Sequence, residues 1–337
     1  MSILKRLVPL LLAVVLLAGC GQTGSTPNAG DTGMDEENMY VDAVELSEDS
    51  IEEEIADEAV ALASSPVAVA KVLKPVASGK KVEKNTKAII DYSNAKDGYV
   101  MVKFTATTQK RLKVLVKGPS GTQYQYNLTP REWTTFPFSD GNGKYTVSVH
   151  ENTTGSKYAK VLSLSLNVTL TDEFAPFIRP NQYVDYENAT NTISMAQKLA
   201  GKEKDPMKKV EKIYDYVVKN FTYDTAKAST VKSGYLPDLD AVLKSKKGIC
   251  FDYAAVMVGM LRSQGVPCKL VVGNAGDVYH AWINVWSEKN GWIDGAIRFN
   301  GKKWERMDPT FASTANSSKK IMQYIGDGSN YDPQLIY

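Results

Sequence analysis

The segment 250–264 constrains the fold more than any other part of this 337-residue chain, because it is apolar on almost every side. A helix without a polar face must be covered all round by other elements, so the segment predicts a central core helix. Gly265 and Pro267 end this helix. Strand-forming runs follow at 269–272, 281–286 and 304–307. The second half of the chain is therefore predicted to be α+β, with a central helix against an antiparallel sheet.

Two further helices are predicted ahead of this core helix. Asp205 is followed by Pro206, which pairs an N-cap residue with a proline at the first helical position. Apolar residues then recur at helical spacing over residues 207–221, which gives this helix one face to bury. Asp238 begins a second, shorter helix, which is expected to stop before Gly248.

Between residues 88 and 171 the apolar period becomes two, the period of a half-buried strand. The predicted strands lie at 99–104, 112–116, 145–149 and 161–170. Gly-Pro-Ser-Gly at 118–121 and Asp-Gly-Asn-Gly at 140–143 supply turns between them. Short, regularly spaced strands predict an antiparallel β-sandwich, which is assigned to residues 85–172. Residues 173–337 are assigned to the α+β domain.

The first twenty residues have the form of a secretory signal peptide. Lys5 and Arg6 precede a short apolar run that ends in small residues. The run is shorter than the roughly 20 apolar residues of a spanning helix, and Pro9 interrupts it. Its last four residues, Leu-Ala-Gly-Cys, resemble the lipobox of bacterial lipoproteins. That resemblance implies that residues 1–19 are removed and that Cys20 is lipidated, which anchors the protein to the extracytoplasmic face of a membrane.

Charge is divided unevenly along the chain. Residues 21–70 hold 13 acidic residues and no lysine or arginine, whereas residues 71–337 hold 38 basic and 25 acidic ones. Residues 20–84 are accordingly assigned to a flexible, acidic linker. The basic excess is concentrated in residues 71–172, with 16 basic and 7 acidic residues. It predicts an anionic cell-wall polymer as a partner, beside the simpler interpretation of a solvated linker before a soluble body.

Several kinds of site are excluded by composition and motif. The two histidines and three cysteines are scattered along the chain, without the closely spaced ligand pairs of a conventional structural zinc site. The chain carries neither a Walker A motif nor a dinucleotide-binding fingerprint. No metal, organic cofactor or nucleic-acid partner is therefore expected.

Three short motifs stand in a fixed order in the second half of the chain. They are Gly248-Ile249-Cys250-Phe251-Asp252-Tyr253-Ala254, His280-Ala281-Trp282 and Asp308-Pro309-Thr310. Residues 188–311, which contain them, resemble the transglutaminase-like superfamily, whose papain-like core carries such motifs in this order. The resemblance implies that Cys250 is the nucleophile, His280 the base and Asp308 the carboxylate that orients the histidine.

The chemistry of these residue types supports the same roles. Cys250 opens a helix, where free N–H groups and the positive end of the helix dipole favour a thiolate and can stabilise an oxyanion. His280 is one of only two histidines, and the other, His150, ends a predicted strand of the β domain. A carboxylate that accepts from His280 would fix its tautomer, the role given to Asp308. Asp294, in an extra excursion ahead of that motif, stays open as a rival.

Cys268 is predicted to remain a reduced thiol in the core. A helix over residues 250–264 is about 22 Å long at 1.5 Å per residue, and Cys268 lies beyond its far end. A disulfide with Cys250 would need Cα atoms within about 7 Å. Tyr223 is left open between simple packing and a role in the substrate cleft.

The motifs predict acyl transfer on an amide through a thioester. A thiol hydrolase acting on surface protein or cell-wall peptide at the cell envelope is favoured. A protein-glutamine gamma-glutamyltransferase and a non-catalytic binding or scaffold module are the alternatives. The hydrolase is preferred because residues 273–277 and 300–303 are short, polar and Gly-rich, which suggests an open cleft rather than an apolar tunnel for an amine.

Overall fold

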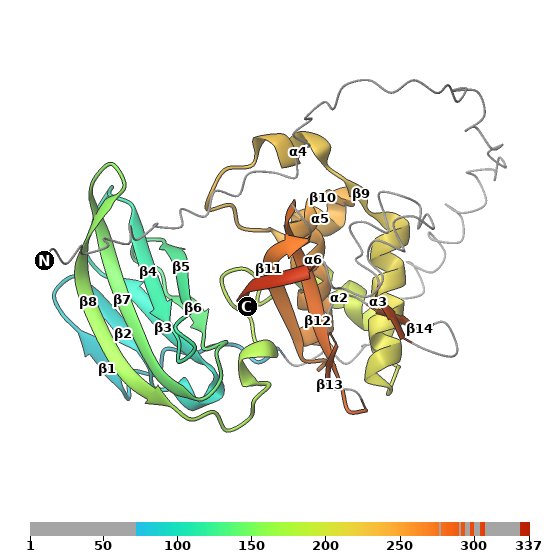
Figure 1. Ribbon diagram of the computed structural model, residues 1–337, viewed down its shortest axis with the longest axis horizontal. Coiled ribbons are helices and arrows are strands. Elements are labelled where there is room, and N and C mark those ends of the chain that lie inside the picture. The colour runs from blue at the N-terminus through green and yellow to red at the C-terminus, as the bar shows by residue number, and fades with distance from the viewer. Residues whose placement is uncertain (1–71, 276–277, 290, 294–296, 300–303, 307–330) are drawn as a thin grey trace, which may run out of the picture. The chain divides into compact units, whose positions relative to one another are not determined.

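The computed structural model describes residues 72–275, 278–289, 291–293, 297–299, 304–306 and 331–337 (Figure 1). Two four-stranded antiparallel sheets form its first half. One has the order β1-β2-β3-β6, with strands Val82–Lys84, Ala88–Asp91, Tyr99–Phe104 and Thr134–Pro137. The other has the order β5-β4-β7-β8, with strands Gln123–Leu128, Leu112–Lys117, Gly143–Thr154 and Lys157–Val168. The predicted all-β region is confirmed.

Alternation of apolar and polar residues explains most of these strands. In β4 the side chains of Leu112, Val114 and Val116 are buried, whereas Lys113 and Lys117 point to the other face. All four predicted strands are present, and β7 and β8 are longer than expected. His150 consequently lies within β7 and not at the end of a strand.

Two strands of the sandwich lack an aliphatic signal in the sequence. In β5 the buried positions are held by Tyr124 and Tyr126, which alternate with glutamines. Strand β6 is only four residues long. In addition, β1 pairs with β2, so the sheet takes in residues 82–84, which the sequence assigned to the linker. The domain boundaries after residues 19, 84 and 172 stay predictions.

Helices α3, Pro206–Asn220, and α5, Leu239–Ser245, confirm the helices predicted from their caps. The Asp205 side chain accepts a hydrogen bond from the Met207 N–H at 2.8 Å, and that of Asp238 accepts from the Ala241 N–H at 3.0 Å. Each carboxylate satisfies a donor that has no acceptor within its helix.

Helix α2, Thr190–Ala200, was not predicted, because its cap comes from another helix. The residue before it is Ala189, which has no side-chain acceptor. The N–H groups of Asn191 and Thr192 instead donate to the carboxylate of Asp240 in α5, at 3.1 and 2.8 Å. Local sequence carries no trace of such a tertiary cap.

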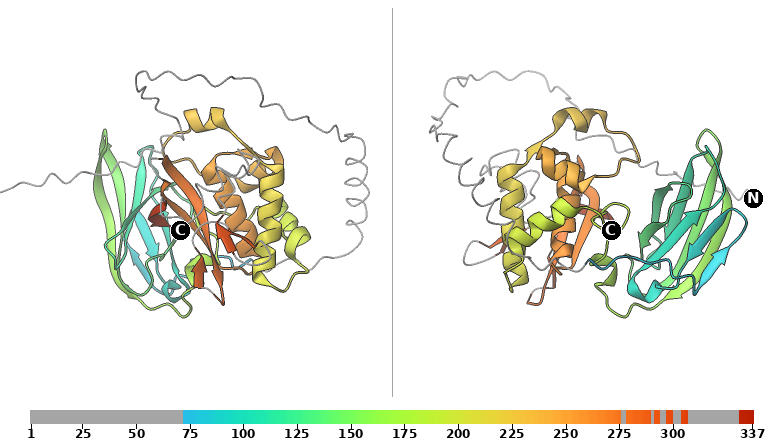
Figure 2. Two further views of the ribbon diagram at one scale, coloured as in Figure 1. Left: turned by 45° about the vertical axis from the view of Figure 1, so that its right-hand side comes forward. Right: turned by 180° about the vertical axis from the view of Figure 1, so that it is seen from behind.

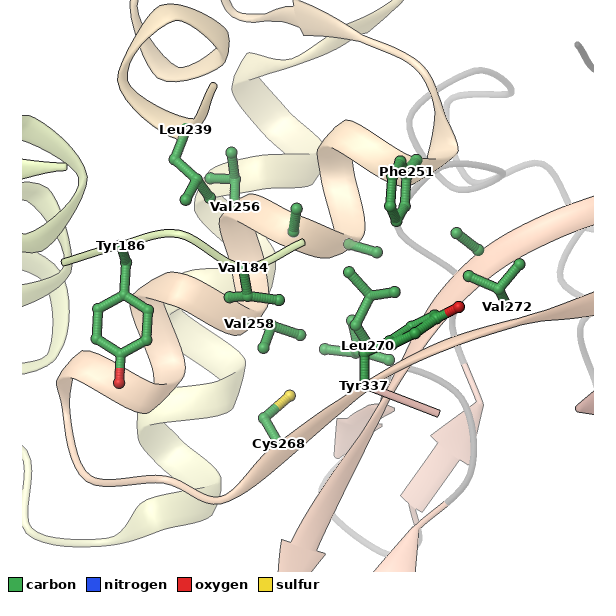
Figure 3. Close-up of a cluster of buried hydrophobic side chains, with 14 of the residues drawn as sticks. Val184, Tyr186, Leu239, Phe251, Val256, Val258, Cys268, Leu270, Val272 and Tyr337 are labelled. Carbon is green, nitrogen blue, oxygen red and sulfur yellow. The ribbon is translucent and has the colours of Figure 1, made fainter. Parts of the chain in front are cut away.

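The predicted central helix is α6, Cys250–Ser263, and all fourteen of its residues are buried. It packs against a sheet of order β13-β12-β11-β16, with strands Gly291–Ile293, Val278–Ser287, Cys268–Ala275 and Tyr331–Ile336. Helices and sheet form two layers (Figures 1 and 2). Val258 of α6 lies on the side of Cys268 and Leu270 of β11, whereas Val256 lies beside Leu239 of α5 (Figure 3). The α+β prediction is confirmed.

Remaining strands form two small sheets. Strand β15, Trp304–Arg306, confirms the predicted strand at 304–307, but it pairs with β14, Ile297–Phe299, in a separate two-stranded sheet. Strands β9, Thr222–Tyr223, and β10, Lys247–Gly248, pair in parallel. This second pair joins the segment after α3 to the segment that enters α6.

A buried arginine ties the far end of α6 to the sheet. Arg262 is 3% exposed, and its guanidinium donates to the main-chain oxygens of Cys268, Tyr337 and Arg179 at 2.8 to 3.0 Å. Burial lowers the pKa of Arg262 to about 10. One guanidinium therefore binds main-chain oxygens at the start of β11 and just after β16, which fixes the sheet to the core helix.

Tyr337 also brings β16 to the β-sandwich. Its ring centroid lies 5.7 Å from that of Tyr124 and 5.8 Å from that of Tyr126, both in β5, and 4.6 Å from that of Tyr183. Such edge contacts between aromatic rings stabilise the packing of large side chains.

Within the described ranges, no helix has both the length and the apolar character needed to cross a membrane.

Candidate active site

The turn from β10 into α6 places Cys250 at the first position of the core helix. Ile249, the residue between them, is extended, with φ −97° and ψ 176°. Cys250 is 9% exposed. The thiol therefore stands at the end of α6 where the first N–H groups of the helix have no acceptor within the helix.

Asp252 fixes the start of α6. Its carboxylate is fully buried and accepts a hydrogen bond from the Ile249 N–H at 2.8 Å, as the third residue of a capping box does. A Cβ atom at Gly248 would lie 2.6 Å from the Cβ of Asp252. The glycine, the cysteine and the aspartate of the first motif are therefore linked physically: the glycine leaves room for the aspartate, which caps the helix that begins with the cysteine.

Two side chains from outside α6 meet the Asp252 carboxylate. Lys227 belongs to α4, Thr225–Thr230, and its Nζ lies 2.6 Å from Asp252 Oδ2. The Tyr235 hydroxyl donates to Oδ1 at 2.5 Å, and Lys227 Nζ donates to that hydroxyl at 2.6 Å. Burial and the hydrogen bond to Asp252 raise the pKa of Tyr235, so it is a neutral donor. The carboxylate is thus satisfied by a cation, a phenol and a backbone amide.

Strand β12 supplies a residue beside the thiol. Burial and, in second place, the Cys250 thiol raise the pKa of Tyr279. Phe251, next to the cysteine, contacts the ring of Tyr183 at 5.5 Å between centroids. The start of α6 and the start of β12 therefore meet at Tyr279, whose chain neighbour is His280.

His280 is 2% exposed and pairs with Gly273 across β11 and β12. Successive residues of a strand point to opposite faces, so His280 leaves β12 on the face of Trp282 and not on that of Tyr279. Its ring centroid lies 6.4 Å from that of Trp282 and 6.5 Å from that of Tyr331 in β16. The imidazole is thus framed by aromatic rings from two strands.

The structure thus puts two of the predicted catalytic residues on elements that pack together, Cys250 at the start of α6 and His280 near the start of β12. Asp308 and its rival Asp294 lie outside the described residues, as does Cys20. Across the part of the chain that is described, no group of three His, Cys, Asp or Glu side chains could hold a metal ion.

Cys268 is the core thiol that the sequence predicts. It is 0% exposed, and its sulfur points into the cluster between α6 and β11 (Figure 3). Burial raises its pKa to about 12. No disulfide joins it to Cys250 within the described ranges.

Tyr223, in β9, pairs with Gly248 of the first motif and is half-buried, which places it near the start of α6.

Four residues around the thiol were not singled out in the sequence. The role of Asp252 could have been found, because a carboxylate two residues after a helix begins is a capping signal. Lys227 and Tyr235 gave no signal, since they reach Asp252 from 25 and 17 residues away in the chain. Tyr279 was passed over beside the histidine of the second motif.

Comparison with known sequences matches residues 193–295 to the transglutaminase-like superfamily. A Bacillus subtilis (strain 168) protein, the uncharacterized protein YebA, is 27% identical over 119 residues. The match covers 30% of this chain but only 16% of that protein. The similarity therefore concerns one segment shared with a much longer chain.

Several solved structures are similar at low identity. A candidate cysteine protease from Cytophaga hutchinsonii has 13% identity and a TM-score of 0.37, covering 71% of this chain and 76% of that one. The periplasmic domain of TgpA from Pseudomonas aeruginosa has 14% identity and a TM-score of 0.33, covering 72% and 100%. Red sea bream transglutaminase has 14% identity and a TM-score of 0.29, covering 65% and 49%. At these scores the solved structures carry no argument, and the similarity to the superfamily rests on the match over residues 193–295.

Proposed function

We propose, on the premise that this chain carries a transglutaminase-like domain, that it is a cysteine acyl-transfer enzyme that hydrolyses amide bonds. The observation that carries the proposal is the position of Cys250. It is the first residue of a fully buried helix whose start is locked by Asp252. A thiol held there is preorganised for attack on a carbonyl.

In the proposed reaction the Cys250 thiolate attacks the amide carbonyl and forms a tetrahedral oxyanion. N–H groups at the start of α6 are suited to stabilise that oxyanion. Protonation of the departing nitrogen by His280 breaks the C–N bond and leaves a thioester on Cys250. His280 then takes a proton from water, which attacks the thioester; the C–S bond breaks, and the step releases a free acid and restores the Cys250 thiolate beside protonated His280. Asp308 is proposed to orient the imidazole.

Hydrolysis is proposed over cross-linking, because water at about 55 M competes with any amine unless the cleft binds the amine and excludes water. Residues 273–275 belong to strand β11 and do not form the expected loop beside the cleft, so the polar segment 300–303 remains the sequence support for an open cleft. Incubation with a glutamine peptide and a fluorescent primary amine tests the reaction class. Free acid is expected to exceed the amine conjugate, and both are expected to require Cys250 and His280.

The proposed site of action is the extracytoplasmic face of a membrane, with surface protein or cell-wall peptide as substrate. The lipobox-like tetrad that ends at Cys20 supports this location. The full chain is expected to partition into membranes, and Cys20→Ser is expected to release it into the soluble fraction. Wild-type protein found in the soluble fraction of cells would contradict the anchor.

We also propose that the β-sandwich contacts an anionic wall polymer, and one row of side chains favours this. Lys113, His150 and Lys160 lie directly opposite one another across β4, β7 and β8. Burial and then Arg111 lower the pKa of Lys113, and burial and then Lys160 lower that of His150. Basic residues placed in register destabilise a sheet, so a polyanion that neutralises them would bind favourably.

Binding to isolated walls that carry teichoic acid is therefore expected to weaken as salt rises from about 50 to about 500 mM. Added salt shortens the screening length and so weakens the attraction between exposed charges. Lys113→Gln with Lys160→Gln is expected to weaken binding at low salt and to flatten the salt dependence. Lys219→Gln, on an exposed lysine of α3 outside the sandwich, is the matched control. Retention that ignores salt would contradict the proposal.

A further inference from the structure

The ion pair between Lys227 and Asp252 lies at the first turn of α6, the helix that the proposed nucleophile begins. Asp252 occupies the same first turn of α6 as Cys250, two residues further along. Its carboxylate is fully buried, whereas the Lys227 side chain is 26% exposed. The Nζ–Oδ2 distance of 2.6 Å makes this a close, charge-assisted hydrogen bond.

A buried carboxylate in that turn opposes the chemistry of the cysteine. A negative charge in the same helical turn as a thiol disfavours the thiolate, and burial strengthens the effect because the local dielectric is low. The carboxylate is nevertheless needed, because it accepts from the Ile249 N–H and fixes the start of the helix. A capping group with full charge would therefore hinder the nucleophile unless a cation stood beside it.

We propose that Lys227 and Asp252 are positioning residues for Cys250: Asp252 fixes the helix start, and Lys227 cancels its charge so that the thiol can ionise. The inference deepens the proposed function and rests on Cys250 as the nucleophile. Tyr235 completes the arrangement by donating to the second carboxylate oxygen, which holds Asp252 in place.

In the part of the chain that the structure describes, Lys227 is the cation in contact with the Asp252 carboxylate. Titratable or charged groups that the structure describes around the start of α6 are Tyr279 from β12, Tyr235, Tyr223 of β9, and the pair Asp224–Lys247 beside β9 and β10. His280 leaves β12 on the face opposite to Tyr279. Tyr279 and Tyr235 have raised pKa values, through burial first, and are neutral near pH 7. Asp224 and Lys247 lie 3.8 Å apart, with the lysine 52% exposed, so their charges offset each other in solvent.

The experiment measures the alkylation rate of Cys250 against pH in the full chain, by peptide mapping after short exposure to iodoacetamide. Lys227→Met leaves the buried carboxylate without its cation, so the midpoint of the profile is expected to rise by about one pH unit. Asp252→Asn keeps an oxygen for the Ile249 N–H but leaves the cation uncompensated, so the midpoint is expected to fall. The double variant removes both charges and is expected to return near the wild-type midpoint.

Midpoint shifts of opposite sign that cancel in the double variant distinguish this role from a structural one. Lost packing would shift the midpoint of both single variants in the same direction. Lys219→Met, which removes an exposed lysine from an i,i+4 pair on α3, is the matched control and is expected to leave the midpoint unchanged. Where Lys227→Met does not fold, the step from Asp252→Asn to the double variant also removes only the cation, and the midpoint must rise. Equal midpoints in all folded variants, or shifts of the same sign, would overturn the inference.

Turnover of a glutamine peptide, measured on the same variants, keeps the two proposals apart. Midpoints that move as expected in a chain with no Cys250-dependent turnover would sink the proposed function and leave the charge balance standing. Cys250-dependent turnover with unchanged midpoints would overturn the charge balance and leave the proposed function standing. In an active enzyme Lys227→Met is expected to shift the acidic limb of the kcat/KM profile upward by the same amount as the alkylation midpoint.

Discussion

Turnover of a peptide amide by this protein is expected to fall by about 10⁴-fold or more in Cys250→Ala, and by a similar factor in His280→Ala. Loss of the nucleophile removes the covalent route, and loss of the imidazole removes both activation of the thiol and protonation of the leaving amine. Because the two groups act as a unit, the double variant is expected to be no slower than the slower single variant. Release of free acid from a defined glutamine peptide measures all three.

Cys268→Ala serves as the control for this prediction. It removes a core thiol from β11 and is expected to keep turnover near that of the wild type while lowering stability slightly through the cavity it leaves. A fluorescent primary amine in the same assay detects cross-linking. Amine conjugate that exceeds free acid, and that vanishes in Cys250→Ala, would replace the hydrolase by a cross-linking enzyme. Unchanged turnover in Cys250→Ala would remove the cysteine mechanism altogether.

The parts of the fold that the sequence predicts are those held by local signals. The core helix follows from its apolar composition, and α3 and α5 follow from Asp205 and Asp238, whose side chains cap the helices they precede. Strand β4 follows from its apolar residues at every second position, Leu112, Val114 and Val116. In each case the residues that determine the element lie within it or next to it.

The parts that could not be predicted depend on contacts distant in the chain. Helix α2 is capped by Asp240, almost fifty residues later. Strand β5 buries Tyr124 and Tyr126, and Tyr126 packs on Phe136 of the other sheet at 4.7 Å between ring centroids. Tyrosines that alternate with glutamine are themselves a strand signal, so β5 could have been predicted, but its packing on the other sheet could not.

In the candidate site, too, residues marked by local motifs could be predicted and residues that depend on distant contacts could not. Cys250 and His280 could be proposed from motifs because their chemistry depends on residue type and order. Lys227 could not, since it comes from a six-residue helix and meets Asp252 only after the chain has folded. A buried carboxylate needs a partner, so Asp252 itself predicts a cation nearby but does not say which one.

Alkylation of the folded protein at about pH 7.5 is expected to label Cys250 at least 10³-fold faster than Cys268. Only a thiolate reacts with iodoacetamide at a useful rate. Burial raises the pKa of Cys268 to about 12, and the neighbouring Arg262 guanidinium lowers it only in part. At neutral pH about one Cys268 thiol in 10⁴ or 10⁵ is therefore ionised, against several per cent of an ordinary thiol. The side chain is also 0% exposed, so the reagent needs local opening to reach it.

The pH dependence adds a second test. Because the pKa of Cys268 lies near 12, its labelling rate is expected to rise about tenfold for each pH unit from 7 to 10, without a plateau. A thiol with an ordinary or lowered pKa levels off within that range, as Cys250 is expected to do. Peptide mapping after timed exposure measures both rates in one sample, and the denatured chain, in which the two thiols should react alike, is the control. Equal labelling of both thiols in the folded protein would contradict the assignment of Cys250 as the reactive cysteine, because a core thiol and a helix-start nucleophile cannot share one rate.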